Sequence, residues 1–271
     1  MSQTHHIDRP DGSRIAYTLE GPAQAPAVVL SNSLATDMRM WDRVLPLLTP
    51  HCRVLRYDSR GHGQSKAGSA MATLDDLGND LLAVMDACHM PRAVVAGVSL
   101  GGMTGLTLAL NHPERLAGLM ACNCRARIDE AGSAGWNQRL GVLASQGMQG
   151  LIESTLERWF TADARQADPQ GMALMRQIVG GTSADGYTAC VKAILGLKLQ
   201  GELHRIQVPV MLLAGAQDGA ASPDEMGSMA ALIAGSQLEV LDPCGHISPM
   251  QRPDDYARLL NQFVTTRAAS Q

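Results

Sequence analysis

The sequence predicts one large α/β domain, built on a mostly parallel central sheet with helices on both faces, that carries a helical insertion. Three observations support this fold class. Short apolar runs typical of buried parallel strands alternate with helical spacings along most of the 271 residues. One such run ends in Gly-Val-Ser-Leu-Gly-Gly at 97–102, directly before a helical pattern. Between about Asn123 and Arg205 the strand signals stop, and only helical spacings separated by glycines recur.

Charge and composition exclude several classes of partner. The net charge is −4 and no cluster of Lys and Arg occurs, which argues against nucleic-acid binding. No apolar run is long enough to span a bilayer. Residues 1–8 are polar and lack the apolar segment of a secretion signal. The six cysteines are scattered and match neither a Cys-x-x-Cys pair nor a zinc pattern. We therefore expect reduced thiols in a cytoplasmic protein without a bound metal.

The first elements are strands separated by turns. Residues 14–20 alternate like a half-exposed strand, and 27–30 form a continuously apolar run typical of a buried strand. A helical spacing at 38–48 precedes the next strand, 53–57. The glycine-rich turn at 58–65 lacks the Walker spacing, so we do not expect it to bind phosphate.

The middle of the chain continues the alternation. Residues 73–88 form an amphipathic helical pattern, with Thr73 as N-cap and Asp76 three residues later, a weaker relative of the capping box. A strand at 92–98, a helix at 100–111 and a strand at 116–122 follow.

After the insertion the pattern resumes with a strand at 208–214, a helix at 223–234, a strand at 237–241 and a helix at 253–266. We therefore predict a core domain of residues 1–124 and 206–271. Residues 125–205 are predicted to form a helical cap, or lid, over the core.

The stretch around Ser99 indicates a nucleophile. A serine between Gly97 and Gly101, with a strand before it and a helix after it, is predicted to stand at a tight turn with its hydroxyl free. Glycines lack the Cβ atoms that would clash where strand and helix cross closely. The N–H groups at the start of the helix point toward any anion that forms beside the hydroxyl. A chance Gly-x-Ser-x-Gly is common, but the flanking strand and helix favour the functional interpretation.

A serine needs a base and an orienting carboxylate, and both follow late strands. Asp218 lies just beyond the strand 208–214, and His246 lies just beyond the strand 237–241. The order Ser, Asp, His is the one expected for this arrangement. Asp129 and Glu130 are the alternative acids, since they follow the strand after Ser99. No metal motif such as His-Glu-x-x-His is present.

These residues carry a resemblance to a known family. The chain resembles the α/β-hydrolases over nearly its whole length and, more narrowly, the 3-oxoadipate enol-lactonases of bacterial aromatic-acid catabolism. The resemblance rests on Ser31-Asn32-Ser33-Leu34, on 55–63, on Gly97 to Gly102, on 112–115, on 215–218 and on Gly245-His246. It extends into the cap at 126–128, 135–137, 158–161 and 186–187.

Two positions depart from the family pattern. Cys124-Arg125 stands where small neutral residues are usual, and Ala35 stands where glycine is common. The fold implied by the resemblance is the α/β-hydrolase fold, with a helical cap inserted after the sixth strand. Arg125 lies next to a strand end, so this departure could alter the choice of substrate.

The resemblance implies a serine hydrolase that opens a small carboxylate-bearing lactone, converting 3-oxoadipate enol-lactone to 3-oxoadipate, in aromatic-compound catabolism. Ser99 would attack the carbonyl, His246 would take its proton, and Asp218 would orient His246. The backbone N–H groups of Leu34 and Leu100 would bind the oxyanion. No cofactor is required.

A carboxylate held under a cap needs a cationic partner. Arg125 and Arg127 enter the cap from a strand end and are the candidates, with Arg139, Arg158 and Lys192 as alternatives. Trp136 is the candidate aromatic wall. The competing interpretations are that these arginines are solvated surface residues and that Trp136 is an ordinary core residue of the cap.

Two rival functions remain open from the sequence. The same scaffold could serve another small ester, amide or C–C substrate, or act as a perhydrolase. It could also be a ligand receptor that retains the triad and signals through its cap. Turnover separates these two classes, because a receptor cleaves its ligand at most slowly and near-stoichiometrically.

Overall fold

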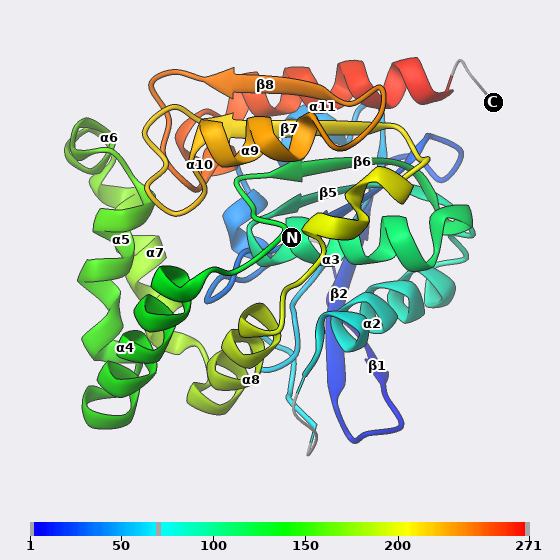
Figure 1. Ribbon diagram of the computed structural model, residues 1–271. Helices are drawn as coiled ribbons and strands as arrows, with labels where there is room; N and C mark the ends of the chain where they lie inside the picture. The colour runs from blue at the N-terminus through cyan, green and yellow to red at the C-terminus, as the bar shows by residue number, and fades with distance from the viewer. Residues whose placement is uncertain (1–2, 69–71, 269–271) are drawn as a thin grey trace.

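An eight-stranded sheet runs through the computed structural model, which describes residues 3–68 and 72–268 (Figure 1). The strands in spatial order are β1 (His5–Asp8), β2 (Arg14–Glu20), β4 (Arg53–Tyr57), β3 (Ala27–Ser31), β5 (Ala93–Val98), β6 (Leu116–Cys122), β7 (Val210–Gly215) and β8 (Gln237–Leu241). β2 pairs antiparallel with β1 and β4, and every other pair is parallel. The mostly parallel sheet predicted from the sequence is therefore confirmed.

The apolar runs form the centre of this sheet. Every residue of β5 and β7 is buried, because helices cover both faces of a parallel sheet. In Figure 1, α2 (Leu74–Ala87), α3 (Leu100–Asn111) and α9 (Pro223–Ala230) lie in front of the sheet and α11 (Pro253–Ala268) lies behind it. The short helices α1 (Leu45–Leu48) and α10 (Ser248–Gln251) complete the core.

The capping hydrogen bonds predicted at the N-terminus of α2 are both present. The Thr73 hydroxyl accepts from the Asp76 N–H at 3.1 Å, and the Thr73 N–H donates to the Asp76 carboxylate at 2.9 Å. These reciprocal bonds satisfy two N–H groups that have no partner inside the helix.

Two elements differ from the sequence expectation. The helix expected at 38–48 is broken into a 3₁₀ turn, η1 (Met38–Trp41), and α1, because Pro46 has no N–H to continue the ladder. The exposed strand β1 was not predicted, since it lacks a buried apolar face.

The stretch between β6 and β7 is helical. It contains α4 (Glu130–Gln146), η3 (Met148–Leu151), α5 (Ile152–Trp159), α6 (Ala162–Ala167), α7 (Pro169–Gly181), α8 (Ala184–Leu195) and η4 (Gln200–Arg205). α4 to α8 gather beside the carboxyl ends of the parallel strands (Figure 1). The exact domain boundaries stay a prediction, and residues 269–271 at the end of the predicted core lie outside the described part.

This helical stretch approaches the core closely at two glycines. The Ser183 N–H donates to the Gly61 carbonyl at 3.2 Å. A Cβ placed on Gly186 of α8 would lie 2.5 Å from the Gly61 Cα and 2.6 Å from the Gly61 oxygen. Only residues without side chains allow the two backbones to approach this far.

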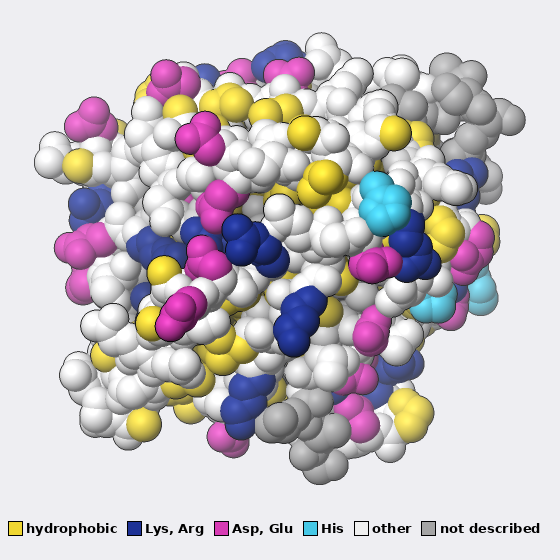
Figure 2. Space-filling view, in the orientation of Figure 1, with side chains coloured by type: hydrophobic (Ala, Val, Ile, Leu, Met, Phe, Trp, Pro, Cys, Tyr) yellow, Lys and Arg dark blue, Asp and Glu magenta, His cyan; other side chains and the backbone are white. Residues whose placement is uncertain are grey.

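Three further features concern the cysteines, the surface charge and the apolar character of the helices. All six cysteines are free and buried. On the face drawn in Figure 2, basic side chains are interspersed with acidic ones. Within residues 3–68 and 72–268, no helix combines the length and apolar character needed to cross a membrane.

Candidate active site

Ser99 stands at a strained turn between β5 and α3. Its φ of 54° lies in the left-handed region, which costs a residue with a side chain about 1–2 kcal/mol. A Cβ on Gly97 would lie 2.2 Å from the Gly101 oxygen, and one on Gly101 would lie 2.1 Å from the Ser31 oxygen. The two glycines therefore permit the close crossing that the sequence predicts.

Asp218 and His246 come together from two different loops. Asp218 follows β7 and His246 follows β8, and the His246 Nδ1 donates to the Asp218 Oδ2 at 2.8 Å. The other carboxylate oxygen accepts from the Ala220 and Ala221 N–H groups at 2.7 and 3.1 Å. Burial opposes the charge of Asp218, but His246 and these donors together hold the pKa of Asp218 below its usual value.

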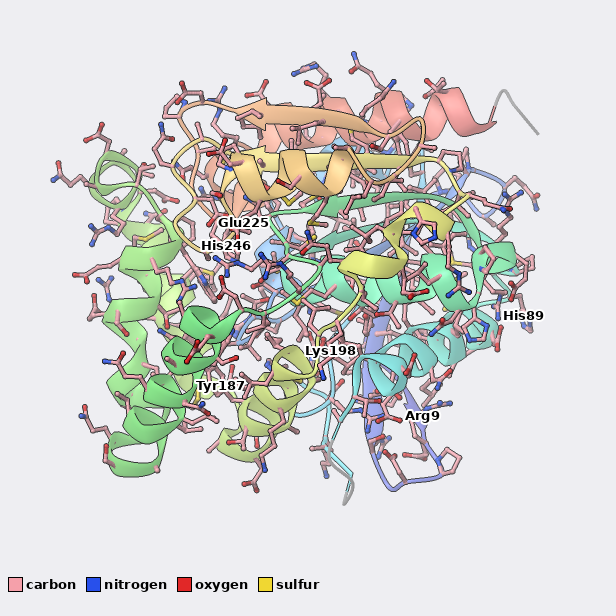
Figure 3. All side chains as sticks on the ribbon, viewed as in Figure 1. Arg9, His89, Tyr187, Lys198, Glu225 and His246 are labelled. Carbon is pink, nitrogen blue, oxygen red and sulfur yellow. The ribbon has the colours of Figure 1, made fainter. Side chains whose placement is uncertain are left out.

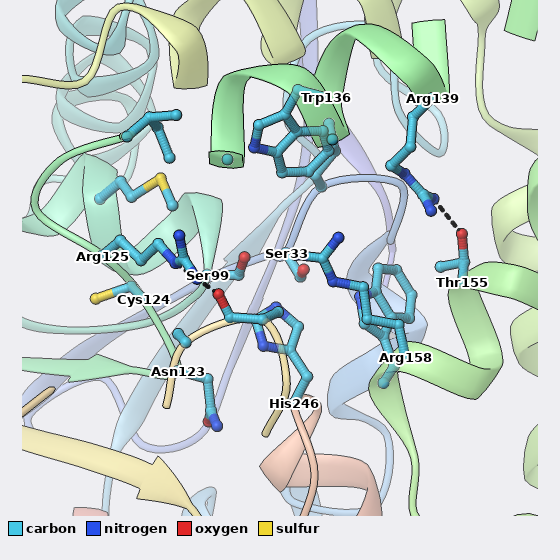
Figure 4. Close-up of a pocket in the computed structure, with 18 of the residues that line it drawn as sticks. Ser33, Ser99, Asn123, Cys124, Arg125, Trp136, Arg139, Thr155, Arg158 and His246 are labelled. Atoms are coloured by element: carbon cyan, nitrogen blue, oxygen red, sulfur yellow. Dashed lines mark hydrogen bonds between the residues drawn. The ribbon is translucent and has the colours of Figure 1, made fainter. Parts of the chain in front are cut away.

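Ser99 and His246 line one pocket of about 290 Å³ (Figure 4). Among the described residues, no hydrogen bond joins the Ser99 hydroxyl to the His246 ring. Of the two hydrogen bonds predicted for Ser99, His246 and Asp218, the one between His246 and Asp218 is therefore present, and the one between Ser99 and His246 is not formed. The alternative acid Asp129 lines the same pocket, but it caps α4 through the Gly132 N–H at 2.8 Å.

The two predicted oxyanion donors are backbone groups beside Ser99. Leu34 lies on the loop after β3, next to Ala35 with its φ of 58°, and it lines the pocket. Leu100 is the first residue of α3, with its side chain buried off the pocket wall, so only its N–H could serve. Within the described part of the chain, neither N–H donates to a protein acceptor.

Arg125 lines the pocket but already has partners. Its Nε donates to the Ala220 carbonyl at 2.7 Å, and its guanidinium lies 3.2 Å from the Glu225 carboxylate. A substrate carboxylate would therefore compete with Glu225 for this side chain.

The placement of Arg127 contradicts its predicted role. Arg127 is exposed and lines a separate small cavity rather than the Ser99 pocket. The Ala126 carbonyl accepts from the Leu199 and Gln200 N–H groups, and Arg127 forms a backbone bridge with Lys198. These contacts join residues 126 and 127 to residues 198–200, and the Arg127 side chain does not line the Ser99 pocket.

Two other arginines line the pocket, and the sequence analysis named them only as alternatives. Arg139 donates to the Tyr187 hydroxyl at 3.0 Å and to the Thr155 hydroxyl. The Arg158 guanidinium lies 5.9 Å from the centre of the Trp136 ring. No carboxylate of the described residues lies within ion-pair distance of either arginine.

Both arginines and the tryptophan come from α4 and α5. Trp136 and Arg139 are three residues apart on α4, so they share one face of that helix, which is a signal available in the sequence. Burial and the positive charges of Arg139 and Arg125 lower the pKa of Arg158. Lys192, the third alternative, does not line this pocket. The cap side of the pocket therefore carries two arginines that have no ion-pair partner among the described residues.

Asn123 is a further residue of this region that the sequence analysis did not single out. It is the first residue after β6, it is fully buried, and it contacts Asp218. No group of three His, Cys, Asp or Glu side chains that could hold a metal ion is found among the described residues.

Comparisons with known proteins bear on the fold and the family of this chain. The family model described as the alpha/beta hydrolase fold matches residues 26–253. The chain is 33% identical over 240 residues to 3-oxoadipate enol-lactonase 2 of Acinetobacter baylyi, covering 89% of each chain. It is 32% identical over 266 residues to 3-oxoadipate enol-lactonase 1 of the same organism, covering 97% and 98%. The crystal structure of the enol-lactonase from Burkholderia xenovorans LB400 superposes with a TM-score of 0.92 at 36% identity, covering 96% of this chain and all of that one.

Proposed function

We propose that this chain, which belongs to the alpha/beta hydrolase family and is a carboxylic-ester hydrolase, acts on a small lactone bearing a carboxylate. One observation carries the proposal. Ser99 and the Asp218-bound His246 share a pocket with Arg139 and Arg158, two arginines without a carboxylate partner among the described residues. The names of the relatives suggest 3-oxoadipate enol-lactone as the substrate.

The positions of these groups support the following reaction. The Ser99 oxygen attacks the lactone carbonyl carbon while His246 takes the serine proton. The N–H groups of Leu34 and Leu100 hold the oxyanion, and its collapse breaks the ring C–O bond. The released enolate takes up a proton and becomes a ketone that is still attached through its acyl group. Water then cleaves the acyl-serine ester, which frees a keto acid with two carboxylates and restores Ser99.

Electrostatics favours an anionic substrate. A carboxylate about 4 Å from a guanidinium gains about 4 kcal/mol at the effective dielectric of a partly buried site, before the cost of desolvation. A charge-assisted hydrogen bond contributes about 1.5–3 kcal/mol net. Trp136 holds Arg158 through its ring face and would form an aromatic wall for the flat lactone.

The test compares an anionic and a neutral substrate. Arg158→Met should lower kcat/KM on 3-oxoadipate enol-lactone about tenfold to a hundredfold and leave p-nitrophenyl acetate hydrolysis nearly unchanged. Arg127→Met is the control, since it removes a nearby arginine that does not line the pocket, and both rates should stay at the wild-type level. Equal losses on the two substrates for Arg158→Met, or a selective loss in Arg127→Met, would refute the assignment.

The broader role belongs to the same proposal. We infer a place in aromatic-compound catabolism, in the β-ketoadipate pathway, and a cytoplasmic location, as the names of the enol-lactonase relatives suggest. A receptor that retains the triad is the rival from another class. Many product molecules released per enzyme molecule would support the enzyme, and a single burst of one equivalent would support the receptor.

A further inference from the structure

The side chain of Asn123 is bonded at each of its polar atoms. Its amide nitrogen donates to the Asp218 Oδ2 at 3.0 Å and to the Gly245 carbonyl at 3.2 Å. Its amide oxygen accepts from the Ser248 hydroxyl at 2.9 Å. Because a hydroxyl donates to that oxygen, the NH₂ group must face the two acceptors.

The backbone of Asn123 is held in an unusual conformation. Its φ is 50°, in the left-handed region, where asparagine is among the few side chains tolerated. Its N–H donates to the Leu213 carbonyl of β7 at 2.8 Å, which extends the sheet by one residue. The chain then turns toward the cap, so the amide stays at the carboxyl edge of the sheet, beside Asp218.

These bonds reach both members of the acid–base pair. The Asp218 oxygen that accepts from Asn123 is the same oxygen that accepts from His246, at 2.8 Å. Gly245 directly precedes His246, and Ser248 follows it by two residues, so the remaining two bonds fix the loop that carries the base. One amide therefore joins β6, the acid loop and the base loop.

We propose that Asn123 is a positioning residue for the hydrolysis, holding the Asp218 carboxylate ionised and aimed at His246 while it fixes the His246 loop. This inference rests on the proposed serine hydrolase function. It requires only that Ser99 be activated by His246 and Asp218, and it does not depend on which ester or lactone is the substrate.

The electrostatic consequence can be worked out from the neighbours of Asp218. His246, Arg158, Cys124 and Cys244 are among the titratable groups of the described residues that interact with this carboxylate. Among the donors that favour its charged form is the Asn123 amide. Without that donor the pKa of Asp218 should rise, because a carboxylate with fewer hydrogen bonds is more basic.

The main variant is Asn123→Gly, which accepts the left-handed backbone and removes only the amide. Ester turnover is followed with p-nitrophenyl acetate. We expect kcat to fall about tenfold to a hundredfold with KM nearly unchanged. We also expect the acidic limb of the pH profile of kcat/KM to move to higher pH.

Two further variants separate positioning from folding. Ser248→Ala removes the outer bond and leaves the amide next to Asp218, so it should lose about two- to fivefold in kcat without moving the acidic limb. His89→Gly replaces another left-handed residue, with φ 52°, which is exposed and lies far from His246 (Figure 3), and this variant should keep wild-type kinetics.

A purely structural role gives a different result. It would lower the melting temperature and the fraction of active enzyme in Asn123→Gly, while the remaining active sites keep the wild-type kcat and acidic limb. That result, or wild-type kinetics throughout, would overturn the proposal.

The rate of labelling of Ser99 by a fluorophosphonate provides a readout without substrate turnover. If wild type and Asn123→Gly are labelled at equal rates, Asn123 does not position the pair. If the wild type hydrolyses p-nitrophenyl acetate but not the lactone, the proposed substrate fails, and the comparison of the Asn123 variants still decides this inference.

Discussion

The contact between Gly61 and Gly186 allows a sharp test of how the cap helices sit on the core. Replacing Gly186 by alanine adds one methyl group in the first turn of α8. That methyl would lie 2.5, 2.6 and 2.8 Å from the Cα, oxygen and carbonyl carbon of Gly61. All three are backbone atoms, so the clash cannot be relieved by turning a side chain. Carbon atoms in contact prefer about 3.5–4.0 Å, so α8 must move by about 1 Å.

The size of the effect follows from two opposing contributions. Alanine stabilises a helix relative to glycine by about 0.5–1 kcal/mol. Forcing an extra methyl group into a packed contact costs about 1–3 kcal/mol. We therefore expect Gly186→Ala to lose about 1–2 kcal/mol, which corresponds to a fall of several degrees in melting temperature for a chain of this size.

Gly141→Ala in α4 is the matched control, because no atom lies within 4 Å of its added methyl group. It should gain about 0.5–1 kcal/mol, so the difference between the two variants isolates the cost of the contact. The assay is thermal and denaturant unfolding of both proteins. Because Tyr187 follows Gly186 and accepts from Arg139, kcat/KM on the lactone should also fall about tenfold in Gly186→Ala. A gain in stability equal to that of Gly141→Ala would refute the reasoning.

Two further predictions concern Ser99 and Asp58. Ser99→Ala should abolish turnover of every ester. It should keep the melting temperature, since the Ser99 hydroxyl makes no protein hydrogen bond in the described part of the chain. Wild-type turnover by the folded variant would eliminate Ser99 as nucleophile. Burial raises the pKa of Asp58 from its usual 3.8 to about 6. Above about pH 6 the charged Asp58 therefore lowers the free energy of unfolding. This loss of stability disappears as the pH falls through 6 toward 3.8, because the folded protein takes up the proton first. The wild type should therefore gain up to about 3 kcal/mol relative to Asp58→Asn between pH 7 and pH 4 in denaturant melts, whereas a constant difference would contradict the shift.

The core elements were predictable because their signals are local. The strands β3, β5 and β7 are apolar throughout, and α2 carries its own capping residues. The strand β1 was missed because its residues are mostly exposed and show no apolar face. Its pairing with β2 depends on the turn that brings the two segments together, with Gly12 at a φ of 84°.

The site was predictable only in part, for a related reason. Ser99, Asp218 and His246 each follow a strand, and strand ends of a parallel sheet meet at one edge. Arg127 was assigned to the pocket wrongly, because the contact of residues 126 and 127 with 198–200 turns it away, and no local pattern encodes a contact across so many residues.

Asn123 and Ala35 show what local patterns leave out. The role of Asn123 depends on three loops that are distant in sequence, so the residue looks ordinary in the chain. Ala35 stands where glycine is common in the family, and its φ of 58° gives the physical reason for that preference.

The buried cysteines have a practical consequence for studies of motion. Burial raises the pKa of Cys52 and Cys88 to about 11 and that of Cys122, Cys190 and Cys244 to about 12, and it raises the pKa of Cys124 further. At pH 8 fewer than about one in a thousand of these thiols is ionised, and maleimides react with the thiolate. A cysteine introduced at the exposed position 141 of α4 would therefore be the fastest site to label. A fluorophore attached there would test whether α4 moves relative to the core, with all six native cysteines kept in place.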